Sequence, residues 1–310
     1  MRARLVAQHK KIFIGVRSLG DVFTENVKNN YEKYKYFFKF APPSESDLAA
    51  NTRDTVVALR EYTGFNKIGY IVTDLPMWDV YVEKSIEPLA ELDGFELVYG
   101  KRFSPDTVDF SSYFAQAEAA GTEILIPIII GSQGISFVKE WYDRQSPMVI
   151  WGGVGSTGSN DFWEVTEGKC EHVTTTVISV DSEYPITSKI LPMRDAYFER
   201  WGKMPSFMAV CAYDIIRFVL PDALERAGTL ETESVIKALE EVDLETASTP
   251  RFAISADSHE VLFGLGYGSQ YCFQWQTNGK FIPMYPRELK EEAGASYTFP
   301  DWPGPWDDLN

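Results

Sequence analysis

Cysteine and histidine are scarce in this chain of 310 residues, which has three of each. The three cysteines, Cys170, Cys211 and Cys272, are odd in number and far apart. This excludes a zinc knuckle or a framework of disulfides, both of which need cysteines at regular, close spacing. We therefore expect each thiol to be buried as a small apolar group. The histidines lack the spacing of metal-binding motifs, so no metal or cofactor is expected.

The chain also lacks a long hydrophobic run. The nearest approach is residues 124–130, which is far shorter than the ~20 apolar residues that span a bilayer. We interpret that run as a buried strand and expect no direct insertion into a membrane. The opening segment, MRARLVAQHKKIFIGV, has basic residues but neither the apolar stretch nor the small-residue cleavage site of a secretory signal.

Basic residues are too few to balance the acidic ones. The chain has 29 Lys and Arg against 45 Asp and Glu, a formal net charge of -16. Such a charge repels phosphate backbones and anionic lipid, so nucleic acid is not expected as a partner. With 45% hydrophobic and 24% charged residues, the composition is that of a folded globular protein.

The signature motifs of enzymes are missing as well. The Gly-rich loop at residues 152–158 has neither the G-x-G-x-x-G pattern nor the GK[ST] ending of phosphate-binding loops, and no G-x-S-x-G elbow is present. The neighbouring carboxylates Asp106 and Asp109, and Glu240 and Glu241, lie at a turn and at a polar helix end. Solvation explains both pairs, and an enzyme on a doubly wound sheet stays an alternative interpretation.

What the chain does have is a regular alternation of short apolar runs and amphipathic segments, which predicts parallel βα units. We expect strands at residues 12–16, 68–72, 95–99, 124–130, 148–151 and 173–180. We expect helices at residues 47–62, 79–92, 111–120, 134–144, 188–201, 207–228 and 232–241. In the helix at 207–228 the apolar face is expected to carry Val210, Tyr213, Ile216, Phe218, Leu220 and Leu224, with Gly228 as its stop.

The pattern changes towards the C-terminus. The apolar runs 271–275 and 281–285 flank Asn278-Gly279, which predicts a hairpin. The last segment, FPDWPGPWDDLN, has too many prolines for a helix, and we expect an extended strap with Trp302 and Trp306 against the body. At the other end, residues 2–11 read as the last turns of a helix without a preceding strand. We expect that the chain starts inside a domain, the alternative being a natural short N-terminal helix.

Five segments occur in an order and at spacings that resemble one family: NYEKYKYFFKFAPPSESD, DLPMWDVYVEK, DFSSYFAQAEAAGTEILI, AYDIIRFVLPDALERAG and YCFQWQTNGKFIPMYP. Together they resemble the periplasmic branched-chain amino-acid (Leu/Ile/Val-type) binding proteins of ABC importers. The resemblance implies the type I periplasmic-binding fold, in which two three-layer α/β/α lobes with mostly parallel sheets hold a ligand between them. By analogy, residues 1–41 and 179–270 form a first lobe, here incomplete, and residues 42–178 and 271–310 form the second.

The resemblance also implies candidate ligand-binding residues. The loop with Arg17, Ser18 and Leu19 corresponds to the segment that binds the α-carboxylate of the ligand in the family. A guanidinium departs from the small residues usual there, but it suits a carboxylate. Trp78 stands where an aromatic residue caps the ligand. For Arg17 the alternative is a surface arginine paired with Asp21, and for Trp78 it is simple packing.

Further candidates follow later strands and open the long helix. Ile130 and Gly131 end the strand at 124–130, and Phe207 begins the helix at a position that often touches ligand. Core or loop structure is an alternative explanation for all three. Gly155 matches the place where amino-acid binders have an acidic residue for the ammonium group, and Asp74 or Asp161 would have to replace it. Because a buried ammonium needs a counter-charge, an organic acid, an amide or an aromatic carboxylate is the alternative ligand to a free amino acid.

The resemblance implies a non-enzymatic substrate-binding component of an ABC importer. It would bind a small amino-acid-like or carboxylate ligand and deliver it by hinge closure to the membrane subunits of a permease. The implied location is the periplasm or the cell surface. Two alternatives stay open at this point: a ligand-sensing regulator or receptor domain of the same fold, and a truncated fragment with no function of its own.

Overall fold

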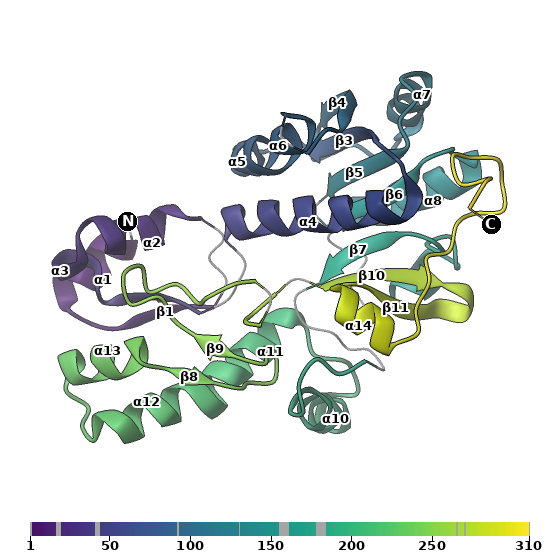
Figure 1. Ribbon diagram of the computed structural model, residues 1–310. Coiled ribbons are helices and arrows are strands. Elements are labelled where there is room, and N and C mark those ends of the chain that lie inside the picture. The colour runs from purple at the N-terminus through teal and green to yellow at the C-terminus, as the bar shows by residue number, and fades with distance from the viewer. Residues whose placement is uncertain are drawn as a thin grey trace. The chain divides into compact units, whose positions relative to one another are not determined.

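The computed structural model describes residues 2–16, 20–40, 44–91, 93–129, 131–154, 161–177, 184–264, 266–269 and 271–309. The chain divides into two compact units (Figure 1). Unit 1 comprises Met1–Leu48 and Ile178–Gln270, and unit 2 comprises Ala49–Val177 and Tyr271–Asn310. The chain therefore passes three times from one unit to the other.

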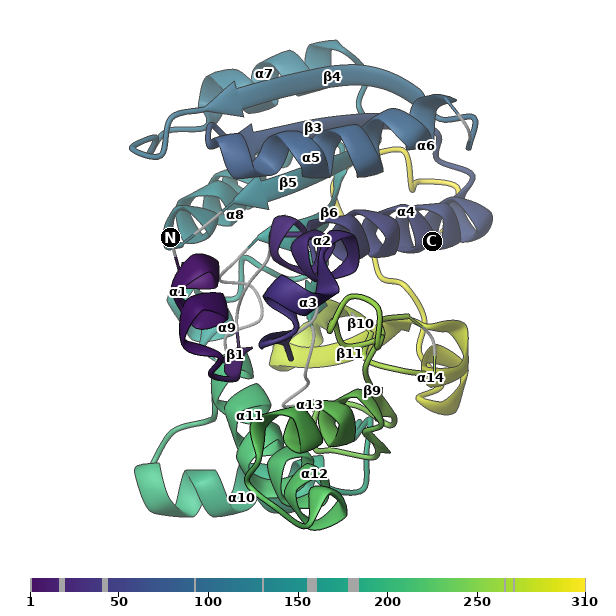
Figure 2. The same cartoon turned by 90° about the vertical axis from the view of Figure 1, so that its left-hand side faces the viewer.

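Unit 2 is built on a seven-stranded sheet with the order β11-β10-β7-β6-β5-β3-β4. Its strands are β3 (Lys67–Thr73), β4 (Glu96–Phe103), β5 (Ile124–Ile129), β6 (Val149–Val154), β7 (Thr174–Val177), β10 (Tyr271–Gln276) and β11 (Lys280–Tyr285). Strands β4, β3, β5, β6 and β7 are parallel to one another, whereas β10 and β11 form the expected antiparallel hairpin. Figure 2 shows β4, β3 and β5 side by side. Every residue of β5 is buried, as in a strand covered on both faces.

Helices and the C-terminal strap complete unit 2. The helical segments are α4 (Glu45–Thr63), which begins in unit 1, η1 (Pro76–Trp78), α5 (Asp79–Tyr81), the π-helical η2 (Val82–Ile86), α6 (Glu87–Glu91), α7 (Ser111–Ala119), α8 (Gln133–Arg144), α9 (Phe162–Val165), η4 (Thr277–Gly279) and α14 (Arg287–Glu292). The strap packs as expected: Trp302 and Trp306 are buried, and Trp302 donates from Nε1 to the carbonyl of Ser146 at 3.1 Å. The prolines prevent a helix, so the two indoles supply the packing.

Unit 1 has less regular structure. Its strands are β1 (Phe13–Gly15) and β2 (Phe37–Lys39), which are parallel, and β8 (Asp243–Leu244) and β9 (Phe252–Ala253), which are antiparallel. Its helices are α1 (Arg2–His9), α2 (Val22–Asn29), α3 (Tyr31–Tyr34), α10 (Ile190–Trp201), α11 (Phe207–Asp214), the π-helical η3 (Ile215–Val219), α12 (Leu220–Ala227) and α13 (Thr232–Glu240). Aromatic side chains of residues 36–40 pack against the π-helical segment, α12 and α13 to form its core.

The long helix of unit 1 runs over the expected residues, and Gly228 ends it with a φ of 63°. The expected apolar face was wrong in its second half, since Ile216 is 70% exposed and Leu224 is 37% exposed. The buried residues there are spaced by four: Ile215, Val219 and Ala223. The additional residue of the π-helical turn rotates the residues that follow the turn, among them Leu224, about the helix axis.

The three cysteines are buried, as expected, and are free thiols in the structure. Burial raises the pKa of the Cys170 thiol to about 12, so it is inert at neutral pH. Among the residues that the structure describes, none of the helices has the length and apolarity to cross a membrane. Within the same ranges, no group of three or more His, Cys, Asp or Glu side chains is arranged to hold a metal ion.

Candidate functional site

The candidate site in unit 2 lies at the edge of the sheet where its parallel strands end. Because β4, β3, β5 and β6 run parallel, their carboxyl ends meet at this edge. Residues 74–78 follow β3, residues 104–110 follow β4, and residues 131–133 follow β5. In open α/β sheets ligands bind outside the carboxyl ends of the strands. We call this edge, with these three segments, the carboxyl edge.

Trp78 is placed at the carboxyl edge by a short turn after β3. The turn η1 begins at Pro76, and the backbone N–H of Trp78 donates to the carbonyl of Leu75 at 3.0 Å. The indole is 7% exposed and meets Tyr81 edge-on, with ring centroids 6.0 Å apart. Its Nε1 is buried and has no hydrogen-bond partner among the described residues. An unpaired buried donor is uncommon in a native structure and asks for an explanation.

Arg102 also lies at the carboxyl edge, and the sequence interpretation missed it. The guanidinium contacts Asp79 at 2.5 Å and Asp74 at 3.5 Å, and all three side chains are at least a third exposed. Asp74 therefore already has a cationic partner. The sequence analysis expected this strand to end near Tyr99. Strand β4 instead continues to Phe103, and this extra length carries Arg102 to the carboxyl edge.

The segment that follows β5 is hydrogen-bonded to the loop that follows β4. Gly131 is exposed and has a φ of 77°, a conformation that favours glycine. Two residues later Gln133 donates from its side-chain amide to the carbonyls of Pro105 and Thr107, the latter at 3.0 Å. This amide thus fixes the loop that follows β4 against the start of α8.

The other candidate residues fall in two groups. Arg17, Ser18 and Leu19, together with Ile130 and Gly155, lie outside the described residues. Phe207 is described and lies in unit 1, where it is half-buried at the start of α11. Ser206 caps that helix, since its hydroxyl oxygen accepts from the N–H of Ala209 at 3.3 Å. Of the predicted residues, the structure brings Trp78 and Gly131 to one edge of one sheet.

Comparison with curated proteins finds relatives that share one name. A curated protein of Brucella abortus (strain 2308), named Leu/Ile/Val-binding protein homolog 7, is 21% identical over 238 residues. The match covers 71% of this chain and 55% of that protein, so the chain spans about half the length of the curated relatives it matches.

Solved structures share the fold at low sequence identity. A structure described as a putative branched-chain amino acid ABC transporter from Silicibacter pomeroyi matches with a TM-score of 0.82 and 13% identity, over 97% of this chain and 78% of that one. A solute-binding protein of an ABC transporter from R. palustris, solved in complex with benzoate, matches with a TM-score of 0.72 and 13% identity, over 91% and 72%.

The fold of this chain is therefore the type I periplasmic-binding fold, with a mostly parallel sheet, as the sequence resemblance implied. The sequence model of one family, described as periplasmic binding protein, matches residues 2–279, which is most of the chain. On that match, the chain belongs to the periplasmic binding protein family.

Proposed function

We propose that this protein is the solute-binding component of an ABC importer and that it binds a small ligand with a carboxylate group. Family membership supports a binder of small solutes over an enzyme. The observation that carries the proposal is the buried, unpaired indole N–H of Trp78 at the carboxyl edge.

An indole N–H can only donate, so its missing partner is an acceptor. A carboxylate oxygen or a hydroxyl group of a ligand would supply that acceptor and remove the cost of the unpaired donor. The indole ring would at the same time offer a flat apolar face to the rest of the ligand. In this proposal Gly131 and Ile130 border the ligand, while Arg17, Ser18 and Leu19 bind its carboxylate. Phe207 and Gly155 are the remaining residues that we propose to contact the ligand.

The ligand we propose lacks an ammonium group. The family's acidic position is Gly155 in this chain, and Asp74 is already paired with Arg102. In this proposal Asp161, the other carboxylate that could serve, does not contact the ligand, so a buried ammonium would have an uncompensated desolvation cost. An aromatic or aliphatic carboxylate avoids that cost. The R. palustris protein in complex with benzoate is a precedent for such a ligand on this fold.

In the proposed mechanism, units 1 and 2 are the two lobes of the fold, and ligand shifts the population towards a closed state. The closed form then docks on the membrane subunits of a permease, with no chemical step. The implied location of the protein is the periplasm or the cell surface.

A thermal-shift screen tests the proposal, with benzoate, hydroxybenzoates and short aliphatic acids in one arm and leucine, isoleucine and valine in the other. A ligand at 100 times its dissociation constant adds ~2.7 kcal/mol of stability, which moves the midpoint by several degrees. We expect shifts with the acids only. Shifts with the amino acids only would refute the ligand class, and no shift with either arm would refute the binding function.

Trp78→Phe isolates the proposed hydrogen bond, because phenylalanine keeps an aromatic face but has no N–H. We expect it to weaken binding of the best acid about tenfold, which corresponds to ~1.4 kcal/mol for one hydrogen bond to a charged group. Trp201→Phe is the matched control, because Trp201 is 57% exposed and belongs to unit 1. Equal affinities of the Trp78→Phe variant and the parent protein would contradict the role of the indole N–H.

A further inference from the structure

A buried pair of hydroxyl groups in unit 2 contacts Trp78, and the proposed function does not yet use it. The hydroxyl oxygens of Thr52 in α4 and Tyr81 in α5 lie 2.5 Å apart, and both residues are 2% exposed. The ring of Tyr81 meets the indole of Trp78 edge-on, with centroids 6.0 Å apart and planes 83° apart. A chain of direct contacts therefore runs from α4 through Tyr81 to the residue that we propose contacts the ligand.

Thr52 is a polar residue on the buried face of α4. The same face carries Val56 and Leu59, four and seven residues later, and both are fully buried. Helices normally place apolar side chains at such positions, because a buried hydroxyl group without a partner costs free energy. The hydroxyl of Tyr81 is a partner for that of Thr52, so the hydrogen bond between them explains a threonine at this position.

The chain changes its helical winding on both sides of Tyr81. The 3-10 turn η1 precedes α5, and the π-helical η2 follows it. In η2 the N–H of Glu87 bonds to the carbonyl of Val82, five residues earlier, and the Ser85 hydroxyl donates to the carbonyl of Tyr81 at 2.6 Å. π-Helical turns are rare and occur frequently at functional sites. Here the two changes of winding determine the direction in which the side chain of Tyr81 points.

The contact between the two hydroxyl groups involves no charge. Burial raises the pKa of Tyr81 to about 12, so its hydroxyl keeps its proton at neutral pH. A neutral hydroxyl group can donate one hydrogen bond and accept others, and the same holds for threonine. The pair can therefore form its hydrogen bond with either residue as the donor.

Helix α4 gives this contact a firm base. It has 19 residues, and its start is capped reciprocally. The N–H of Ser44 donates to the carboxylate of Asp47 at 2.9 Å, and the N–H of Asp47 donates to the hydroxyl of Ser44 at 3.1 Å. Side chains that are anchored on helices hold their positions better than side chains on loops. Trp78 itself ends a three-residue turn, so its indole depends on its neighbours for a fixed orientation.

We propose that Thr52 and Tyr81 are positioning residues of the ligand site, in which their hydrogen bond fixes the Tyr81 ring and thereby the orientation of the Trp78 indole. A hydrogen bond weakens steeply when the N–H does not point at its acceptor. An indole that is already held in place also spares the ligand the entropy cost of ordering it. The inference rests on the proposed function for the ligand, whereas the orientation of the indole is also a property of the ligand-free protein.

Tyr81→Phe tests the contact without ligand, because phenylalanine keeps the ring and removes only the hydroxyl group. The readout is the indole ¹H–¹⁵N signal of Trp78, one of eight in the chain, which is assigned by its loss in Trp78→Phe. We expect this N–H to exchange with solvent about tenfold faster in Tyr81→Phe and in Thr52→Val, as for the loss of one hydrogen bond. Thr52→Ser keeps a hydroxyl group and should restore the parent rate. Unchanged rates in both Tyr81→Phe and Thr52→Val would refute the positioning role.

Binding of benzoate, measured by calorimetry, tests the consequence for a ligand. We expect Tyr81→Phe to weaken binding about threefold to tenfold when residue 78 is tryptophan, and to have no further effect in the Trp78→Phe background. Equal losses in the two backgrounds would mean that the hydroxyl group of Tyr81 acts elsewhere, which overturns the proposal. If benzoate does not bind to the parent protein, the exchange rate of the ligand-free indole decides the role of the pair by itself.

Tyr99→Phe is the matched control. Tyr99 is 7% exposed, and its hydroxyl group has no hydrogen-bond partner among the residues that the structure describes. It pairs in register with Gly69 near the start of β3, whereas the carboxyl edge follows the end of that strand. We expect the exchange rate of the Trp78 indole and the affinity for benzoate to remain those of the parent protein. Changes as large as in Tyr81→Phe would show that the loss of any buried hydroxyl group in unit 2 disturbs the site, and would refute a specific role of the pair.

Discussion

Asp214 is a carboxylate buried within an otherwise apolar helix, at 1% exposure. It accepts hydrogen bonds from the backbone N–H groups of Ala247 and Ser248, both at 2.8 Å, and from the Ser248 hydroxyl at 2.5 Å. Burial raises the pKa of the Asp214 carboxyl, and these hydrogen bonds oppose the rise. The side chain thus supplies acceptors to a turn whose donors have no strand or helix to satisfy them.

Asp214→Ala should destabilise unit 1 by about 2–4 kcal/mol, because it leaves two backbone donors without an acceptor in the interior at ~1–3 kcal/mol each. Ser248→Ala removes only the hydroxyl donor and should cost about 1 kcal/mol. Denaturant unfolding followed by circular dichroism measures both. Equal losses in the two variants would show that the backbone contacts of Asp214 contribute nothing.

At the scale of the element, the long helix of unit 1 shows how one turn changes which residues are buried. Before the π-helical segment the helix buries Val210, Cys211 and Asp214, and from the first residue of that segment, Ile215, the buried positions recur every four residues. A uniform period of 3.6 residues through the whole segment gives the wrong face for its second half. The sequence pattern predicts the helix and its end at Gly228, but it does not predict the additional residue in the π-helical turn.

Two adjacent isoleucines test this assignment. Ile215 is 4% exposed and Ile216 is 70% exposed, so Ile215→Ala should cost about 2–5 kcal/mol while Ile216→Ala changes stability by no more than ~0.5 kcal/mol. The two substitutions are chemically identical, so each is the control of the other. A larger loss for Ile216→Ala in thermal or denaturant unfolding would mean that the regular helical face is the buried one.

The elements of unit 2 were largely predictable, because its strands are continuous apolar runs separated by amphipathic helices. Strand β2 of unit 1 was missed, since it has only three residues and ends on Lys39, a residue type that normally stays in water. Lys39 is nevertheless fully buried, paired with Glu260 from 221 residues further along the chain. A local sequence pattern cannot reveal an ion-pair partner that is so distant in the sequence.

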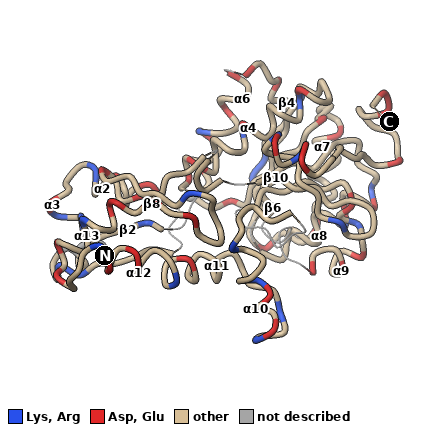
Figure 3. The backbone as a smooth tube through the Cα atoms, turned by 60° about the horizontal axis from the view of Figure 1, so that its bottom comes forward, with Lys and Arg blue, Asp and Glu red and all other residues tan. Residues whose placement is uncertain are grey.

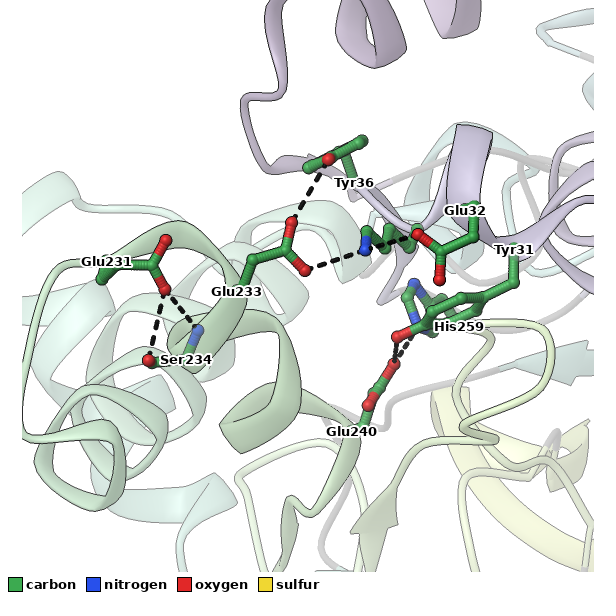
Figure 4. Close-up of polar contacts among 9 residues, drawn as sticks. Tyr31, Glu32, Tyr36, Glu231, Glu233, Ser234, Glu240 and His259 are labelled. Atoms are coloured by element: carbon green, nitrogen blue, oxygen red, sulfur yellow. Dashed lines mark hydrogen bonds and ion pairs between the residues drawn. The ribbon is translucent and has the colours of Figure 1, made fainter.

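The candidate site was predictable only as far as family resemblance identifies positions. Resemblance led to Trp78, but the unpaired state of its Nε1 depends on everything that surrounds the indole in the fold. Arg102 was missed because alternation of residue types does not reveal where β4 ends. The same holds for Tyr31 and His259, which both contact Glu240 although the three residues come from separate segments of the chain (Figure 4).

For the whole molecule, the dominant electrostatic fact is the net charge of -16. Figure 3 shows acidic residues along elements of both units, including α12 of unit 1 and α6 of unit 2. Many of the described ion pairs are exposed; in the pair of Arg287 with Glu291 the side chains are 85% and 62% exposed. Such pairs contribute little, so repulsion among the excess carboxylates is the larger long-range effect.

Salt should therefore stabilise this protein at neutral pH. Raising NaCl from 10 to 150 mM shortens the Debye length from ~30 to ~8 Å, which screens the repulsion between distant carboxylates. We expect a gain of about 1 kcal/mol, seen as a rise of about 2–4 °C in the thermal midpoint at pH 7. At pH 5, close to the isoelectric point of about 4.7, the excess charge is nearly gone and the rise should disappear. A midpoint that falls with salt at pH 7 would instead mean that attractive pairs, such as Arg251 with Asp243 at 2.6 Å, outweigh the net repulsion.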